Sequence, residues 1–235
     1  MIAPDGDRPS NDTSDAPLAR FALGTSATAA GLAAAAERLR ASVVQVHGPG
    51  GNGGGAGIAW RGGAIVTSAH VVSSRAVTVV LPDGRAVAGE VVARDAHRDL
   101  ALVRAPDAAL PAVRAADPRA LRPGSLLFAV GHPLGVLDAV TTGVLQATGP
   151  LPPGLGVPGM PRDVEWVQAD VRLAPGNSGG PLADAEGRVV GVAAMVVAGL
   201  GLAVPAPDVD AFVADGARPR RPGRPAGRGR RPAFI

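Results

Sequence analysis

The sequence of 235 residues contains neither cysteine nor lysine. Without cysteine, disulfides, thiolate nucleophiles and cysteine-ligated zinc or iron–sulfur sites are excluded. Without lysine, a P-loop phosphate grip, Schiff-base chemistry and a serine–lysine dyad are excluded as well. Serine and histidine therefore remain as the groups that could carry nucleophilic catalysis.

Aromatic residues make up only 3% of the chain and tyrosine is absent. Stacking platforms for nucleic-acid bases are nearly missing, which argues against a reader of single strands. The 46% of hydrophobic residues must build the core from Val, Leu, Ile and Ala. The apolar stretch 21–36 is too short to span a membrane, so no transmembrane segment is expected. No convincing signal peptide is present either, and the compartment stays open.

The net charge of +3 hides an uneven distribution. Residues 216–235 hold seven arginines and no acid, whereas residues 1–215 hold 16 arginines and 20 acids. This Arg/Pro/Gly-rich end lacks apolar periodicity, so we expect a disordered tail over 214–235. It is either a solvated extension or an electrostatic contact to nucleic acid, an acidic partner or an anionic surface. Residues 1–30 are expected to form a flexible leader.

Between these ends, short β-rich segments alternate with turn residues, as in the Pro82-Asp83-Gly84 step. A helix is expected over 33–40, before the first strand. The pattern predicts an all-β sandwich or barrel rather than a doubly wound α/β sheet. Strands are expected at 43–47, 64–68, 77–81, 87–92, 99–103, 125–130, 139–147, 164–169, 188–194 and 199–204.

The string PGNSGGP at 175–181 places Ser178 among glycines. Small neighbours clear space around a serine Oγ and let backbone N–H groups converge on an oxyanion. The string also fits the nucleophile elbow of α/β-hydrolases, which requires the order serine, acid, histidine. All four histidines precede Ser178, so the order excludes the elbow: His47, His70, His97 and His132.

The order histidine, aspartate, serine is that of chymotrypsin-type hydrolases. His70 follows the apolar strand 64–68, where rigid structure could hold a general base. Asp99 opens the apolar run DLALV, where a buried carboxylate could fix the histidine tautomer. Asp95 is the alternative acid. Together with Ser178, His70 and Asp99 form the predicted catalytic set.

The chain resembles the HtrA-type, trypsin-like serine endopeptidases over about residues 33–213. The matching strings are SVVQV, IVTSAHVV, LPDGRAVAGEVVARDAHRDLALVR, LRPGSLLFAVGHPLGV, VTTGVLQATG, VQADVRLAPGNSGGPL, GRVVGVAAM and GLGLAVP. The resemblance implies two perpendicular six-stranded β-barrels within a protease domain at 31–213, with an N-terminal barrel at about 41–118 and a C-terminal barrel at about 119–207. It covers the protease domain only, and no PDZ domain is expected.

The resemblance also implies roles for individual residues. Ser178 would attack the scissile bond of an unfolded or exposed polypeptide, His70 would carry the proton, and Asp99 would orient His70. Backbone N–H groups of Gly176 and Ser178 would form the oxyanion hole. No cofactor or metal is implied. A homotrimer and a place in the cell envelope are suggested by the family alone. The residues falling where the family lines its P1 pocket are Leu173, Val197 and Leu200.

Three positions depart from the family pattern. Ala56 stands in GAG where serine is more usual, which is expected to affect packing only. His132 replaces the commoner Asn or Ser and is interpreted as an ordinary loop residue rather than a second base. Ala198 alone separates AAMVV from GLGLAV, so a loop beside the specificity pocket is shortened. This shortening motivates an alternative function, a catalytically inactive peptide-binding or chaperone-like module on the same fold.

Two other patterns are set aside. Residues 51–56 formally satisfy a dinucleotide-binding fingerprint, but no helix start follows, and a surface loop is expected there. His97 and Asp95 lie near Asp99 without the spacing of a metal site.

Overall fold

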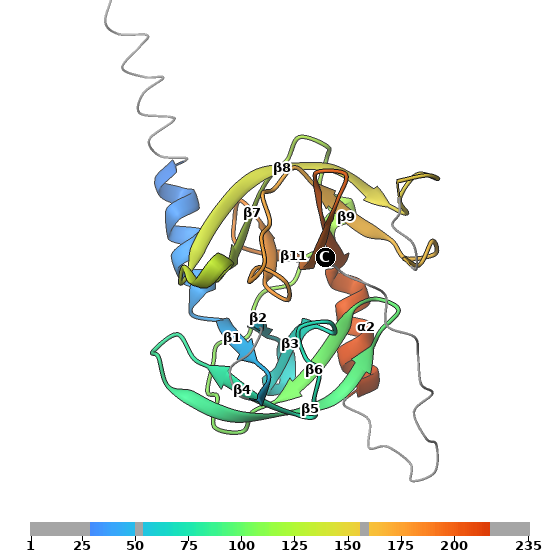
Figure 1. Cartoon of the computed structure of the whole chain (residues 1–235). Helices are drawn as coiled ribbons and strands as arrows, with labels where there is room; N and C mark the ends of the chain where they lie inside the picture. The colour runs from blue at the N-terminus through green and yellow to red at the C-terminus, as the bar shows by residue number, and fades with distance from the viewer. Residues whose placement is uncertain (1–28, 50–53, 156–159, 217–235) are drawn as a thin grey trace, which may run out of the picture.

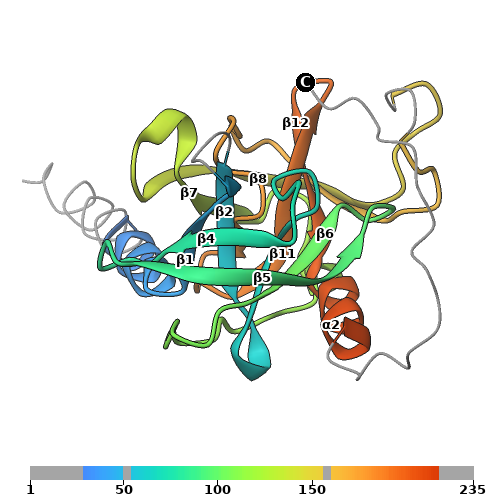
Figure 2. The same cartoon turned by 60° about the horizontal axis from the view of Figure 1, so that its bottom comes forward.

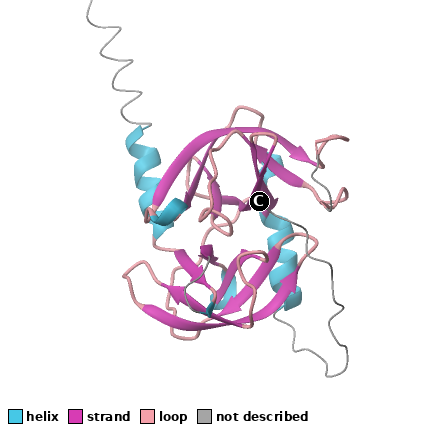
Figure 3. Cartoon of the chain, viewed as in Figure 1, coloured by secondary structure: helices cyan, strands magenta, loops and turns pink. Residues whose placement is uncertain are grey.

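A computed structural model describes residues 29–49, 54–155 and 160–216 of the chain. Strands form most of it, with a helix near each end of the described part (Figure 3). Of the predicted leader 1–30 and Arg-rich tail 214–235, only 29–30 and 214–216 are described, and these residues are helical rather than disordered. The strands are β1 Val43–His47, β2 Gly54–Ala59, β3 Ala64–Ser68, β4 Ala76–Val80, β5 Ala86–Asp95, β6 Leu100–Arg104, β7 Leu126–Gly131, β8 Ala139–Gly149, β9 Trp166–Ala169, β10 Pro181–Asp184, β11 Val189–Val197 and β12 Leu200–Pro205. The α-helices are 29–40 and α2 Ala206–Gly216, and short 3-10 turns occur at Arg61–Gly63, Pro118–Ala120 and Pro133–Gly135.

The twelve strands close into two antiparallel barrels, seen one above the other in Figure 1. The order around the first is β1-β2-β3-β6-β5-β4, and around the second it is β10-β11-β12-β9-β8-β7. Closure leaves neither sheet with an open edge. The predicted all-β fold of two six-stranded barrels is therefore confirmed.

All ten predicted strands are present, and two further strands and a helix were missed. The expected surface loop at 51–56 is wrong for Gly54–Ala56, which belong to β2, while 51–53 lie outside the described residues. Glycines weaken a strand signal, but here they allow close approach: a Cβ on Gly57 would lie 2.9 Å from a methyl carbon of Val46. β10 was missed because it is four residues long and begins with a proline.

The largest apolar cluster lies between the barrels. In β6, Leu100 and Leu102 belong to this cluster, while Ala101 and Val103 fill the interior of the first barrel. Successive side chains of a strand point to opposite faces, so a strand buried on both sides has a continuous apolar sequence such as LALV. The second barrel contributes Phe128, Val130, Val192 and Val204 to the same cluster.

Helix α2 follows β12 of the second barrel and also packs against β5 and β6 of the first (Figure 2). Its buried residues are Ala206, Val209 and Val213, which recur at helical spacing. The indole Nε1–H of Trp60 donates to Asp210 Oδ1 at 2.7 Å, and Arg61 forms an ion pair with the same carboxylate. The helix thus fastens the two barrels together.

The helix 29–40 lies beside the beginning of β8 (Figure 1). Its Arg40 donates from Nε and Nη2 to the carbonyl of Asp138, at 3.1 and 2.8 Å. This helix therefore contacts the segment that connects β7 to β8. Among the described helices, none has the length and apolar character needed to cross a membrane.

Candidate active site

Asp99 binds His70 through both carboxylate oxygens. Oδ1 accepts the backbone N–H of His70 at 2.9 Å, and Oδ2 lies 2.7 Å from the ring Nδ1. His70 follows β3 and Asp99 precedes β6, which are paired strands. The Asp99 side chain is 4% exposed and that of His70 is 27% exposed, so the carboxylate is buried while the ring remains accessible.

The backbone of Asp99 adopts a left-handed conformation, with φ of 57°. Aspartate is among the few side chains that tolerate this region, because its short polar group bonds locally. The carbonyl of Asp99 also accepts the N–H of Ala69 at 2.9 Å. Three hydrogen bonds therefore fix Asp99 against the Ala69–His70 segment.

Asp95, the alternative acid, serves the β5–β6 turn instead. Its Oδ1 accepts the N–H groups of His97 and Arg98 at 2.9 and 3.1 Å, and its Oδ2 binds the Arg98 guanidinium at 2.9 Å. His97 Nε2 lies 3.0 Å from Asp163. This hydrogen bond lowers the pKa of the exposed Asp163 carboxyl. Within the described chain, no group of three or more metal-ligating side chains occurs.

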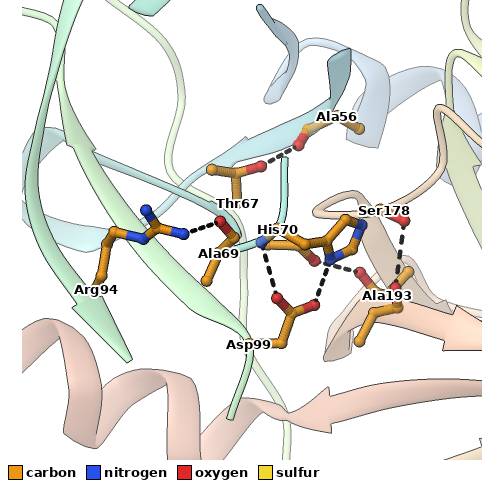
Figure 4. A network of polar contacts seen from close by, with 10 residues as sticks. Ala56, Thr67, Ala69, His70, Arg94, Asp99, Ser178 and Ala193 are labelled. Atoms are coloured by element: carbon orange, nitrogen blue, oxygen red, sulfur yellow. Dashed lines mark hydrogen bonds and ion pairs between the residues drawn. The ribbon is translucent and has the colours of Figure 1, made fainter. Parts of the chain in front are cut away.

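Ser178 lies in the segment between β9 and β10 and faces the first barrel. In Figure 4 the His70 ring lies between the Asp99 carboxylate and the Ser178 side chain, with its second nitrogen toward the serine. The Ser178 hydroxyl donates to the carbonyl of Ala194 at 3.2 Å. The structure therefore brings together the three residues that the sequence singled out, from both barrels.

Glycine 179 is required at the next position. Its φ is 84°, and a Cβ there would lie 2.2 Å from the Ala56 carbonyl oxygen and 2.3 Å from Thr67 Oγ1. Its N–H donates to the carbonyl of Ala193 at 2.7 Å. No side chain fits this contact between the segment around Ser178 and the first barrel.

Gly176 and Ser178 supply the backbone N–H groups predicted for an oxyanion hole. Neither N–H donates to a protein acceptor within the described residues. The carbonyl groups on either side are engaged: Pro175 accepts from Leu134 at 3.0 Å, and Gly176 accepts from His132 at 3.1 Å. Two N–H donors two residues apart are thus available to an anion beside Ser178.

Several contacts that hold the site were not found from the sequence. The backbone N–H of Ala56 donates to the carbonyl of Ser178 at 2.9 Å, so the GAG segment contacts Ser178 directly through its main chain. The Ser68 hydroxyl donates to Ala193, and Arg94 donates to the carbonyl of Ala69, next to His70, at 2.6 Å. Such bonds depend on pairs distant in sequence, which no local pattern reveals.

The three predicted pocket residues pack against two different apolar clusters. Leu173 lies against Gly201, whose Cβ would meet a Leu173 methyl carbon at 3.1 Å, and it packs on the interior of the second barrel. Val197 and Leu200 are cross-strand partners that pack on the cluster between the barrels. The turn joining them is two residues, Ala198 and Gly199, both with positive φ, as a type I′ hairpin requires.

The β7–β8 loop holds the unexpected feature of the site. His132 is only 9% exposed, and its Nδ1 accepts the N–H of Asp138 at 3.2 Å. Its Nε2 is buried without a hydrogen-bond partner among the described residues. Burial lowers the pKa of His132 below its ordinary value, while the charge of Asp138 acts in the opposite direction. His132 was interpreted from the sequence as an ordinary loop residue, but in the structure its side chain is buried.

Comparison with known proteins identifies this architecture. Residues 55–192 match the trypsin-like peptidase domain. The chain belongs to the trypsin-like peptidase family. Within this family its relatives are HtrA-type, as the sequence motifs predicted. HhoB of Synechocystis sp. is 40% identical over 147 residues, covering 61% of this chain and 35% of HhoB. The mitochondrial serine protease HTRA2 of Drosophila pseudoobscura is 36% identical over 167 residues, covering 69% of this chain and 39% of HTRA2.

A solved structure of the HtrA-type protease AlgW with a tripeptide superposes with a TM-score of 0.71 and 27% identity. The match covers 78% of this chain and 62% of AlgW. This trypsin-like peptidase chain therefore spans well under half of the curated relatives and under two thirds of the structural neighbour.

Proposed function

We propose that this trypsin-like peptidase is a serine endopeptidase that cleaves unfolded or exposed polypeptides through His70, Asp99 and Ser178. The observation that carries the proposal is the 2.7 Å contact between Asp99 Oδ2 and His70 Nδ1, on a ring whose other nitrogen is turned toward Ser178 (Figure 4). Membership of the family and the names of its relatives support the same reaction.

The geometry suggests how the proton moves. A buried carboxylate at Nδ1 keeps the proton of the neutral ring on that nitrogen, which leaves the lone pair on Nε2. The Ser178 hydroxyl turns from the Ala194 carbonyl to His70, gives up its proton and attacks the scissile carbonyl carbon. The imidazolium, stabilised by Asp99, then protonates the leaving amine, and an acyl-enzyme forms. A water molecule then gives a proton to His70 and attacks the acyl carbon in the same way, and Ser178 is released.

The negative charge that develops on the scissile oxygen would be held by the N–H groups of Gly176 and Ser178. Fixed donors in place before reaction cost no reorganisation, and losing one lowers the rate by about a hundredfold or more. Both N–H groups are without a protein acceptor within the described residues, which supports this role.

Labelling by a fluorophosphonate probe tests the proposal. The wild-type chain should be labelled on Ser178 and should cleave casein. Ser178→Ala should lose the label and nearly all cleavage, whereas Ser73→Ala, a change at an exposed serine, should retain both. Wild-type protein that binds unfolded polypeptide but is neither labelled nor cleaves casein would instead support the inactive peptide-binding module.

For the P1 pocket we propose lining by Leu173, Val197 and Leu200, with a preference for small or medium apolar side chains. Truncating Leu173 to alanine enlarges the space beside Gly201, so relative kcat/KM should shift toward larger P1 residues. Leu110→Ala, a truncation in the first barrel, is the control and should leave the ranking of P1 residues unchanged. A ranking unchanged by Leu173→Ala would remove Leu173 from the pocket.

A further inference from the structure

The loop of residues 132–138 contacts the segment that precedes Ser178. Leu134 N–H donates to the carbonyl of Pro175, and His132 N–H donates to the carbonyl of Gly176. A Cβ on Gly176 would lie 2.2 Å from the His132 carbonyl oxygen, so the two backbones touch. This loop is therefore the immediate support of the Pro175–Gly176 peptide.

The direction of the Gly176 N–H follows from that support. A peptide group is planar and trans, so its N–H points opposite to its C=O. The Pro175 carbonyl points toward Leu134 of the loop, and the Gly176 N–H consequently points away from it. If the loop moved, the Pro175 carbonyl would lose its partner and the peptide could rotate. The orientation of one proposed oxyanion donor thus depends on the loop.

The side chain of His132 closes the loop across its ends. Its Nδ1 accepts the N–H of Asp138, and the Asp138 carbonyl is held in turn by Arg40 of the helix 29–40. Because an accepting nitrogen carries no proton, the neutral ring has its proton on Nε2. A protonated ring would present an N–H to the Asp138 N–H, and the bond would be lost.

The charged groups around His132 come from three elements. The Asp138 carboxylate, on the same loop, is 3.9 Å from Nδ1 and favours protonation. His47 of β1 disfavours it, and Arg40 approaches Asp138 from the helix 29–40. Burial is the largest influence and lowers the pKa of His132. The ring is therefore neutral near neutral pH and becomes charged only in acid.

We propose that His132 is a positioning residue for the oxyanion hole, since its neutral ring closes the loop that orients the Gly176 N–H and its protonation opens that loop. The proposal rests on the proposed peptidase function. Activity then has two proton-dependent requirements in acid: His70 must be neutral to accept the Ser178 proton, and His132 must be neutral to hold the loop.

Two substitutions of His132 distinguish the roles of its two ring nitrogens. In His132→Asn the amide Oδ1 occupies the place of Nδ1, so it can accept the Asp138 N–H without titrating. In His132→Gln the amide lies one carbon further out, at the place of Nε2, and cannot make that bond. His97→Asn removes an exposed imidazole outside the loop and serves as the control.

The full chain is assayed with a peptide ester from pH 4 to 9. At pH 8 we expect His132→Gln to lower kcat/KM by about tenfold or more, chiefly through kcat, because the Gly176 N–H is misplaced in this variant. His132→Asn should recover most of this loss. In acid, log kcat/KM of the wild type and His97→Asn should fall more steeply than first order in protons, whereas His132→Asn should fall with first order.

Superimposable acid limbs for the wild type and His132→Asn would overturn the proposal, and so would wild-type kcat at pH 8 in His132→Gln. If His132→Gln does not fold, as judged by circular dichroism, the pH profile of His132→Asn decides alone. Fluorophosphonate labelling of the wild type keeps the two proposals distinct. If the wild type is not labelled, the proposed peptidase function itself fails. If the wild type is labelled but the His132 variants have the same pH profile and kcat as the wild type, only the role of His132 is refuted.

Discussion

The carboxylate of Asp99 holds His70 at two points, the backbone N–H at 2.9 Å and the ring Nδ1 at 2.7 Å. One residue thereby fixes both the position of the histidine backbone and the orientation of its ring. A histidine on a strand end otherwise rotates freely about two side-chain bonds, so this double contact accounts for the alignment of the ring with Ser178.

Asp99→Asn should lower kcat by about ten-thousandfold while the chain still folds, because an amide N–H at Nδ1 would favour the wrong tautomer of His70. Asp95→Asn is the control, since Asp95 serves only the β5–β6 turn. Steady-state hydrolysis of a peptide ester measures both. If Asp95→Asn were the damaging change, Asp95 rather than Asp99 would be the catalytic acid.

Gly179→Ala should destabilise the protein much more than Gly84→Ala. Both glycines have φ of 84°, so each substitution carries a backbone cost of about 1–2 kcal/mol. The new methyl at Gly84 meets open space, whereas at Gly179 it collides with Ala56 and Thr67. Urea unfolding gives the free energy of unfolding for each variant. Equal losses of stability would show that the segment around Ser178 shifts to accommodate the methyl group at little cost.

The stability of the wild type should depend on His132 in acid. Burial lowers the pKa of the folded ring below its ordinary value of 6.5. As the pH falls through the ordinary pKa, His132 takes up a proton in the unfolded chain before it does so in the folded chain. The free energy of unfolding therefore decreases until the folded ring is also protonated. His132→Asn lacks this proton and should lose less stability between pH 7 and 5. Parallel pH dependences, measured by urea unfolding, would contradict the burial of His132.

Asp210→Ala should destabilise the fold by about 1–3 kcal/mol, since the buried Trp60 Nε1–H would lose its acceptor. Asp208→Ala, on the same helix, should cost well under about 1 kcal/mol, because its contact with Arg98 is exposed and 3.9 Å long. Thermal unfolding compares the two. A larger loss for Asp208→Ala would mean that α2 is anchored by its exposed face.

Most of the strands were predictable from the sequence, and so was the grouping of His70, Asp99 and Ser178 at one place in the fold. The run LALV showed a buried strand, and the glycines around Ser178 showed a close approach of backbone. β2 was missed because its glycines serve contacts with Val46 and Ser178, which are distant along the chain. Helix α2 had a usable signal in the spacing of Val209 and Val213, but the prolines at 205 and 207 obscured it.

The support of the site was beyond prediction for a related reason. Ala56, Arg94 and His132 act through backbone groups of residues distant in sequence, at distances that only the closed barrels set. A single sequence shows that His132 departs from the family pattern. It does not show that the ring is buried or that Asp138 donates to it.

The hydrogen bond between Trp60 and Asp210 joins residues 150 positions apart. On the ribosome, the first barrel with His70 and Asp99 emerges before α2 is made, so the contact between Trp60 and Asp210 can form only after α2 has been synthesised. The face that α2 covers stays open until the last described element has been synthesised. The proposed catalytic set also needs Ser178, which lies in the second half of the chain, so it cannot form while only the first barrel has been synthesised.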